Sequence, residues 1–304
     1  MRARILGLVA AAVSVAAITA GAGAAQASEL PVIYNGTLGY AHISSTASPP
    51  GSNNFACKPS AAHPRPVILV HGTFADMSDS WQALSPLLYN HGYCVFAFNY
   101  GSYAGSGILG IYGTGNIVKS AEELSSFVNS VLTATGASQV DLVGHSQGGM
   151  MPRYYLKNLG GASKVHTLVG LAPSNHGTTL DGLATLAGYF PGADAFLGIL
   201  CPACEQQTSG SFIPNLNSGG ETVAGVNYTV IESKYDEVVT PYTSAFLSGP
   251  KVTNITLQNQ CILDLGEHLS MPYDHIADAD VLTALDPEQP QKPACTPVLP
   301  VVGG

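Results

Sequence analysis

Residues 140–149 read VDLVGHSQGG, the most informative stretch of the chain. Three of its first four residues are apolar, and the short run 140–143 is expected to form a buried parallel strand. A G-x-S-x-G pattern centred on Ser146 follows directly, and a helix is expected after it over 150–159. A sharp turn from strand to helix strains its central residue, and small residues two positions before and after it avoid a steric clash. The stretch therefore predicts that Ser146 is a nucleophile raised clear of the sheet edge. A purely structural turn is the alternative.

Similar apolar runs recur along the chain and alternate with helical patterns. Strands are expected over 67–70, 94–98, 140–143, 165–171, 226–231 and 252–257. Helices are expected over 80–89, 116–135, 150–159 and 279–285, with a Gly-rich loop over 101–115. Strands that alternate with helices imply a parallel sheet covered by helices on both faces. The sequence therefore predicts an α/β fold with a mostly parallel central sheet.

Two segments depart from this alternation. Residues 28–66 are rich in Ser, Pro, Gly and Asn and are expected to form an irregular N-terminal wrap. Residues 176–222 lie between two strands and hold an apolar, helix-like piece over 183–200, followed by the motif CPAC. Insertions between strands commonly form lids or the walls of binding sites. The segment 176–222 is therefore expected to line or cover the site, or else merely to pack over the core.

The N-terminus has the features of a secretory signal. Arg2 and Arg4 precede an uncharged run over 5–20, and Ala25-Gln26-Ala27 supplies small residues for cleavage. The apolar run is shorter than the length that a membrane-spanning helix normally needs, although an uncleaved N-terminal anchor is the alternative. We expect residues 1–27 to be removed, leaving 28–304 as a single domain that is secreted, monomeric and without a stable membrane anchor.

The charge balance excludes one class of partner. The 304 residues hold 11 Lys plus Arg against 20 Asp plus Glu, a formal net charge of −9. Phosphate binding needs a basic footprint, so nucleic acid is not an expected partner.

Six cysteines in an exported chain indicate disulfides, although the sequence alone does not choose among 15 pairings. Position along the chain favours three pairs. Cys201 and Cys204 could close a small loop, Cys57 and Cys94 flank the first core strand, and Cys261 and Cys295 flank the C-terminal segment. A redox pair or a zinc site at CPAC is the alternative. A redox pair normally opens a helix, whereas Pro202-Ala203 is expected in a loop, and zinc needs further clustered ligands.

A serine hydroxyl needs a base and an acid, which in this architecture follow it in the chain. Asp236 comes just past the expected strand 226–231, at the edge where parallel sheets gather functional groups. Asp236 is therefore the expected acid, with Glu232 and Glu237 as competitors.

Two histidines lie downstream of this acid. His268 comes after the strand 252–257 and before the last helix, where the final loop should deliver a base. His275 is the alternative and could be a solvated loop residue. The histidines at positions 71, 145 and 176 are expected to be structural or to line the pocket.

Acyl transfer also requires two donors for the oxyanion. One is expected to be the backbone N–H of Gln147, at the head of the helix after Ser146. The second is expected in the loop after the strand 67–70, where Gly72 allows a close approach and the N–H of Thr73 is the candidate. The Thr73 hydroxyl could add a contact.

Four blocks of the chain together resemble a known family. VILVHGTF (67–74), GHSQGG (144–149), SKYDEVVTPY (233–242) and EHLSMPYDH (267–275) are similar to blocks of the secreted class 2 lipases of actinomycetes, within the α/β-hydrolase superfamily. The resemblance implies an α/β-hydrolase fold with Ser146, Asp236 and His268 as nucleophile, acid and base. It also implies Thr73 and Gln147 as oxyanion donors, and the pairs Cys57–Cys94 and Cys261–Cys295.

The predicted activity is hydrolysis of carboxylic esters through an acyl-enzyme, with no metal or organic cofactor required. A secreted enzyme with few charged residues suits lipids or other water-insoluble esters, with acylglycerols first, as in a triacylglycerol lipase. A polyester-degrading hydrolase of the same fold and a catalytically silent lipid-binding relative are the alternatives.

Overall fold

The computed structural model describes residues 28–41, 44–197 and 200–304; the expected signal at 1–27 lies outside them. In these residues the central sheet has six strands, all parallel, in the order β2-β1-β3-β4-β5-β6. Their bounds are β1 Val67–Val70, β2 Val95–Phe98, β3 Val140–His145, β4 Val165–Leu171, β5 Asn227–Glu232 and β6 Val252–Thr256. Every residue of β1, β2 and β3 is buried, which explains why strands with two covered faces read as apolar runs.

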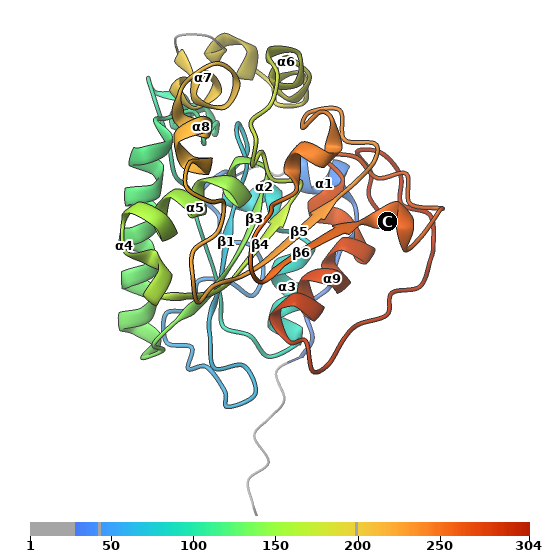
Figure 1. Cartoon of the computed structure of the whole chain (residues 1–304). Coiled ribbons are helices and arrows are strands. Elements are labelled where there is room, and N and C mark those ends of the chain that lie inside the picture. Colours follow the sequence, from blue (N-terminus) through green and yellow to red (C-terminus); the bar gives the residue numbers. More distant parts are fainter. Residues whose placement is uncertain (1–27, 42–43, 198–199) are drawn as a thin grey trace, which may run out of the picture.

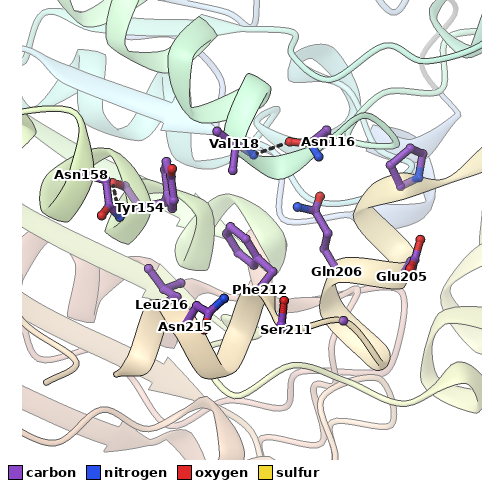
Figure 2. Close-up of a pocket in the computed structure, with 12 residues that line it drawn as sticks. Asn116, Val118, Tyr154, Asn158, Glu205, Gln206, Ser211, Phe212, Asn215 and Leu216 are labelled. Carbon is purple, nitrogen blue, oxygen red and sulfur yellow. Dashed lines mark hydrogen bonds between the residues drawn. The ribbon is translucent and has the colours of Figure 1, made fainter. Parts of the chain in front are cut away.

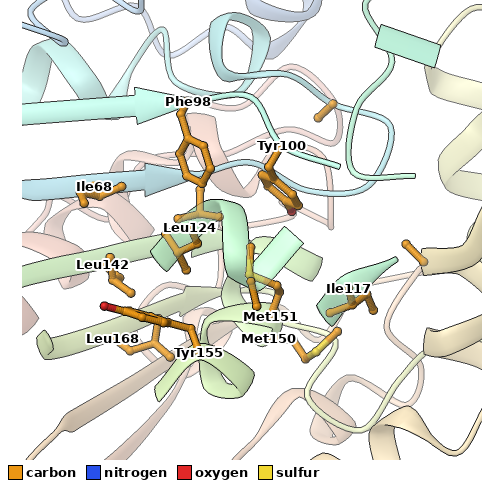
Figure 3. Packing of buried hydrophobic residues seen from close by; sticks show 14 of the residues in the cluster. Ile68, Phe98, Tyr100, Ile117, Leu124, Leu142, Met150, Met151, Tyr155 and Leu168 are labelled. Carbon is orange, nitrogen blue, oxygen red and sulfur yellow. The ribbon is translucent and has the colours of Figure 1, made fainter. Parts of the chain in front are cut away.

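Helices cover both faces of the sheet, which confirms the predicted α/β architecture (Figure 1). One face carries α4 (Ile117–Thr135) and α5 (Gln147–Asn158), and the other carries α3 (Leu84–Asn90) and α9 (His275–Leu285). Each face has its own cluster of buried apolar residues. Figure 3 shows the cluster beneath α4 and α5, where Leu124, Met150 and Met151 pack against strand residues. The helices therefore cover both faces of the sheet, and the functional residues can gather only at the edge formed by the carboxyl ends of the strands.

The expected single helix over 80–89 was wrong, because the chain forms two short helices there. The first, α2 (Met77–Ser80), begins earlier because the Asp76 side chain accepts hydrogen bonds from the backbone N–H groups of Ser78 and Asp79. The second, α3, begins at Leu84 and has Pro86 in its first turn. Proline has no N–H to donate to the preceding turn, so a continuous helix is broken before it.

Other helix boundaries differ by a few residues. The last helix, α9, begins at His275 rather than 279, since the Asp274 side chain caps it by accepting from Ile276 and Ala277 N–H. The N-terminal wrap contains one short helix, α1 (Gly36–Tyr40).

The described part of the insertion between β4 and β5 places the α-helices α6, α7 and α8 over one end of the sheet (Figure 1). Their bounds are α6 Leu180–Tyr189, α7 Pro202–Thr208 and α8 Phe212–Asn217. Here the loop expected at CPAC was wrong, because Cys201 is the N-cap of α7 and Pro202 is its first residue. Proline suits that position, where its missing N–H would have no intrahelical partner.

All six cysteines are paired, in the combination that chain position favoured. The disulfides are Cys57–Cys94, Cys201–Cys204 and Cys261–Cys295. Within the described residues, no group of three or more His, Cys, Asp or Glu side chains could hold a metal ion. None of the helices in the described part of the chain has the length and apolar character needed to cross a membrane.

Candidate active site

Ser146 lies at the sharp turn between β3 and α5. Its backbone has a φ of 55° and a ψ of −125°, a conformation that residues with a side chain rarely adopt. A Cβ added to Gly144 would overlap the carbonyl oxygen of Gly148, and one added to Gly148 would overlap that of Val70. Both glycines are therefore required by backbone contacts, and they hold Ser146 in its strained position.

Asp236 and His268 form a buried pair at the carboxyl edge of the sheet. The Nδ1 atom of His268 lies 2.7 Å from Asp236 Oδ2, and neither side chain is exposed. The other carboxylate oxygen of Asp236 accepts hydrogen bonds from the N–H groups of Val238 and Val239, each at 2.7 Å. The Nε2 atom of His268 is buried and has no hydrogen-bond partner among the described residues. The carboxylate thus fixes the imidazole with Nε2 free to accept a proton.

Several acidic groups act on the pKa of His268. Burial lowers this pKa, but the carboxylate of Asp236, followed by those of Glu237 and Glu267, outweighs burial and raises it above its usual value. Glu237 itself has both carboxylate oxygens buried without a partner in the described structure. Burial, and then the neighbouring Glu267, raises the pKa of Glu237 to about 7. The base therefore lies in an acidic environment that favours its protonated form.

The competing residues are placed differently. Glu232 ends β5 and accepts a hydrogen bond from Ser233 N–H at 2.8 Å, and burial followed by the Asp236 charge raises its pKa. His275 begins α9, where its Nδ1 lies 2.5 Å from the oxygen of Gly304 and its Nε2 lies 2.9 Å from that of Ala294. The structure brings Asp236 and His268 together, and it places His275 against C-terminal residues instead.

The candidate oxyanion donors lie beside Ser146. A Cβ added to Gly72 would stand 3.0 Å from Ser146 Cβ, so the loop after β1 passes close to the serine. Gln147 is the first residue of α5, and its N–H therefore has no intrahelical acceptor. The side-chain amide of Gln147 donates to Thr73 Oγ1 and to Gly113 O, both at 2.7 Å. The two residues that carry the candidate donors are thus tied directly to each other.

The three histidines expected to be structural or to line the pocket are placed in different surroundings. His71 is buried and stacks on Tyr100 with ring centroids 4.3 Å apart, and burial lowers its pKa to about 4. His145 Nε2 lies 2.8 Å from the carbonyl oxygen of His268, and burial lowers the pKa of His145. His176 lies at the surface and contacts Glu221 Oε1 at 2.8 Å.

One polar residue beside the site was not anticipated from the sequence. Gln207, in α7, donates from Nε2 to Thr73 Oγ1 at 3.2 Å and accepts at Oε1 from the Ser174 hydroxyl at 2.7 Å. It lies 134 residues from Thr73 along the chain. Its proximity to CPAC is the one nearby sequence feature, and CPAC itself indicated a disulfide rather than a site.

Ser146 is only 3% exposed, and the insertion packs close to the site. The start of α6 lies against the segment after Asp236, because the Thr178 hydroxyl donates to Val238 O and a Cβ on Gly182 would overlap the same oxygen. On the outer side of the insertion, a hollow of about 530 Å³ lies between α4, α5, α7 and α8 (Figure 2). Tyr154 and Phe212 are among its lining residues, and the nucleophile and base are not. That hollow is therefore separate from the candidate site.

Comparison with known proteins agrees with this architecture. The family model described as Lipase (class 2) matches residues 64–277. Triacylglycerol lipases from Pseudarthrobacter phenanthrenivorans and Burkholderia plantarii are each 40% identical to this chain over 99 residues, which is 31% of this chain. The match covers 28% and 25% of those two proteins, so it spans about a quarter of the length of these curated relatives.

Solved structures show the same fold. Lipase B from Aspergillus fumigatus has a TM-score of 0.55 at 21% identity, over 82% of this chain and 57% of that chain. The mature form of the Bacillus licheniformis lipase BlEst2 has a TM-score of 0.54 at 15% identity, over 75% of this chain and 94% of that chain.

Proposed function

Because the chain belongs to the class 2 lipase family and is thereby a carboxylic ester hydrolase, we propose that it is a secreted serine lipase acting on water-insoluble esters, acylglycerols first. Ser146 is the nucleophile, His268 the base and Asp236 the acid. The observation that carries the proposal is the buried Asp236–His268 pair, whose imidazole keeps Nε2 free, together with a strained serine at the turn after β3.

The mechanism is acyl transfer to water. Ser146 Oγ attacks the ester carbonyl carbon while His268 Nε2 takes the hydroxyl proton, and Asp236 stabilises the imidazolium that forms. The carbonyl oxygen becomes an oxyanion, which the N–H groups of Thr73 and Gln147 bind. When the oxyanion collapses, the bond to the alcohol breaks and His268 protonates the leaving oxygen. Water, deprotonated by the same base, then cleaves the acyl-enzyme and regenerates Ser146.

Exposed apolar side chains near the loop that carries Thr73 support a water-insoluble substrate. A recess of about 420 Å³ beside the loop after β1 is lined by the apolar Phe74, Ile111 and Phe190 and by polar residues that include Asp76 and Asp79. On its rim, Ile108 is 90% exposed and Leu109 is 66% exposed. Such exposed apolar side chains are costly in water and suit contact with a lipid phase or a polymer surface.

The deciding experiment measures hydrolysis of p-nitrophenyl esters from C4 to C16 by the secreted protein, beside Ser146→Ala. We expect activity that extends to long chains and is abolished in the variant. Activity confined to C4 would favour a short-chain or polyester hydrolase. A folded wild type that is inactive on every chain length would contradict the enzyme and favour a silent lipid-binding relative.

Secretion and assembly are tested on the same preparation. We propose that cleavage after Ala27 leaves residues 28–304 as one monomeric domain, and the three disulfides suit an oxidising compartment. Intact mass spectrometry of the exported protein should give a chain that begins at Ser28, and size-exclusion chromatography with light scattering should give a monomer mass. Retention of Arg2 and Arg4 in the product would contradict cleavage.

A further inference from the structure

The hydroxyl of Thr73 receives hydrogen bonds from two glutamine side chains. Gln147 Nε2 lies 2.7 Å from Thr73 Oγ1 and Gln207 Nε2 lies 3.2 Å from it. Each amide is oriented by a backbone carbonyl, because Gln147 Nε2 also donates to Gly113 O and Gln207 Nε2 also donates to Ala203 O. Both glutamines therefore present their NH₂ groups, which can only donate, to the same oxygen.

This arrangement determines what the hydroxyl can do. A hydroxyl oxygen has two acceptor lone pairs and one proton, and the two amides fill both lone pairs. The proton of Thr73 Oγ1 has no acceptor among the described residues, although Thr73 is only 1% exposed. A buried donor without an acceptor costs free energy in the resting protein. The hydroxyl is thus held as a donor that awaits an acceptor beside Ser146.

We propose that Gln207 is a positioning residue for catalysis. It keeps the Thr73 hydroxyl turned as a donor toward the oxyanion that develops when Ser146 attacks the ester. This inference rests on the proposed serine hydrolase mechanism and adds a residue from the insertion to it. A donor that is already oriented requires no reorganisation as charge develops, which is how such groups lower the barrier.

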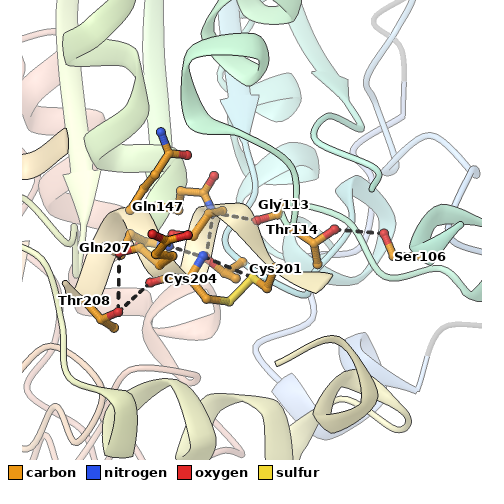
Figure 4. Close-up of a disulfide and its surroundings, with 12 residues drawn as sticks. Ser106, Gly113, Thr114, Gln147, Cys201, Cys204, Gln207 and Thr208 are labelled. Carbon is orange, nitrogen blue, oxygen red and sulfur yellow. Dashed lines mark hydrogen bonds between the residues drawn. A yellow bond between two sulfur atoms is a disulfide. The ribbon is translucent and has the colours of Figure 1, made fainter. Parts of the chain in front are cut away.

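Helix α7 is built to hold Gln207 in place. The Ser174 hydroxyl donates to Gln207 Oε1 at 2.7 Å, and the Gln207 carbonyl accepts from Thr178 N–H at 2.9 Å. The Cys201–Cys204 disulfide closes the first turn of the helix (Figure 4). From that turn, Ala203 N–H donates at 3.1 Å to Thr114 O, next to the Gly113 carbonyl that orients Gln147. The insertion is thereby joined to Thr73 through the Gln207 side chain and to Thr114 through a backbone hydrogen bond.

The test is Gln207→Glu, which keeps the side-chain size but replaces the NH₂ donor by an acceptor. The Thr73 proton then turns toward the carboxylate, and we expect kcat to fall by about tenfold to a hundredfold, with KM changed less than twofold. The matched control is Gln206→Glu on the same helix. Gln206 Oε1 accepts from Ile117 N–H at 2.7 Å, a role that a carboxylate retains, so wild-type kcat is expected.

A double-mutant cycle separates positioning from a merely structural role. In a Thr73→Val background, Gln207→Glu should cause no further loss of kcat, whereas Thr73→Ser should retain most of the activity. A full additional loss in the Val background, or a loss in KM alone, would overturn the proposal. Should Gln207→Glu fail to fold, equal kcat values for Thr73→Val and Thr73→Ser would overturn it independently. An inactive wild type would instead point to failure of the proposed function.

Discussion

The turn at Ser146 and the helical insertion meet at Thr73, yet they are held in place by different forces. At the turn, contacts between backbone atoms leave no space for a Cβ at Gly144 or Gly148. In the insertion, α7 reaches the site through the Gln207 side chain and a disulfide. The turn is therefore fixed by sterics within a few residues, whereas the insertion depends on hydrogen bonds between distant parts of the chain.

The middle of α5 shows the same contrast. Arg153 is buried, and its guanidinium donates to the backbone oxygens of Asn175 and Glu221 and to Asn217 Oδ1 at 2.6 Å. Burial lowers its pKa to about 10. Helix α5 therefore begins next to the nucleophile, and the guanidinium of its Arg153 holds residues of the insertion through hydrogen bonds. Substitutions at the turn are therefore expected to abolish folding or activity. Substitutions in the insertion are expected to change stability or activity by smaller amounts.

The most severe test of the comparison is Gly144→Ala. The new Cβ would overlap the Gly148 carbonyl oxygen, and neither backbone can move without displacing β3 or α5. We expect a destabilisation of more than about 4 kcal/mol, which exceeds the usual range for a point substitution. Soluble yield and circular dichroism measure it. A folded variant with the wild-type melting temperature would show that the turn is less constrained than its contacts imply.

A second test replaces the acid of the Asp236–His268 pair, through Asp236→Asn. The amide cannot stabilise an imidazolium at His268, and kcat is expected to fall on the order of 10⁴-fold with the fold retained. The matched control is Glu232→Gln, because Glu232 is buried nearby with a raised pKa and an amide imitates its protonated form. The control should change kcat less than tenfold, and the reverse order of effects would assign the acid to Glu232.

The same division explains what the sequence could predict. Strands β1 to β5 were predictable because each is a short run of mostly buried residues, whereas β6 is only partly buried. Ser146, Asp236 and His268 each come after one of the six strands. Short local sequence patterns therefore predicted the fold and the candidate triad together. Gln207 was not predictable, because its role arises from a hydrogen bond across 134 residues that leaves no local pattern. CPAC was misread as a loop for a related reason: α7 is short and is completed by its cap and disulfide.

A smaller effect is expected where the insertion meets the base, through Glu237→Gln. Activity requires neutral His268, and the Glu237 carboxylate is one of the charges that raise its pKa. Removing that charge lowers the pKa of His268, so the acid limb of the kcat/KM profile should move to lower pH. Since the pKa of Glu237 is itself about 7, Glu237 is only partly ionised there, and we expect a shift on the order of half a pH unit. A shift to higher pH in the measured profile would contradict this account.

The smallest effect concerns Gly188→Ala, which repeats the Gly144 substitution within the insertion. Gly188 lies in α6, and a Cβ there would have no atom of the described structure within 4 Å. Alanine restricts the unfolded chain and favours a helix, so α6 should gain about 0.5–1 kcal/mol. Hydrogen exchange of the α6 amides should slow by about two- to fivefold, the factor that corresponds to this free energy, while the global melting temperature changes little. Slower exchange accompanied by a higher global melting temperature would mean that α6 opens only with the whole domain, and the insertion would then be as firmly built as the turn at Ser146.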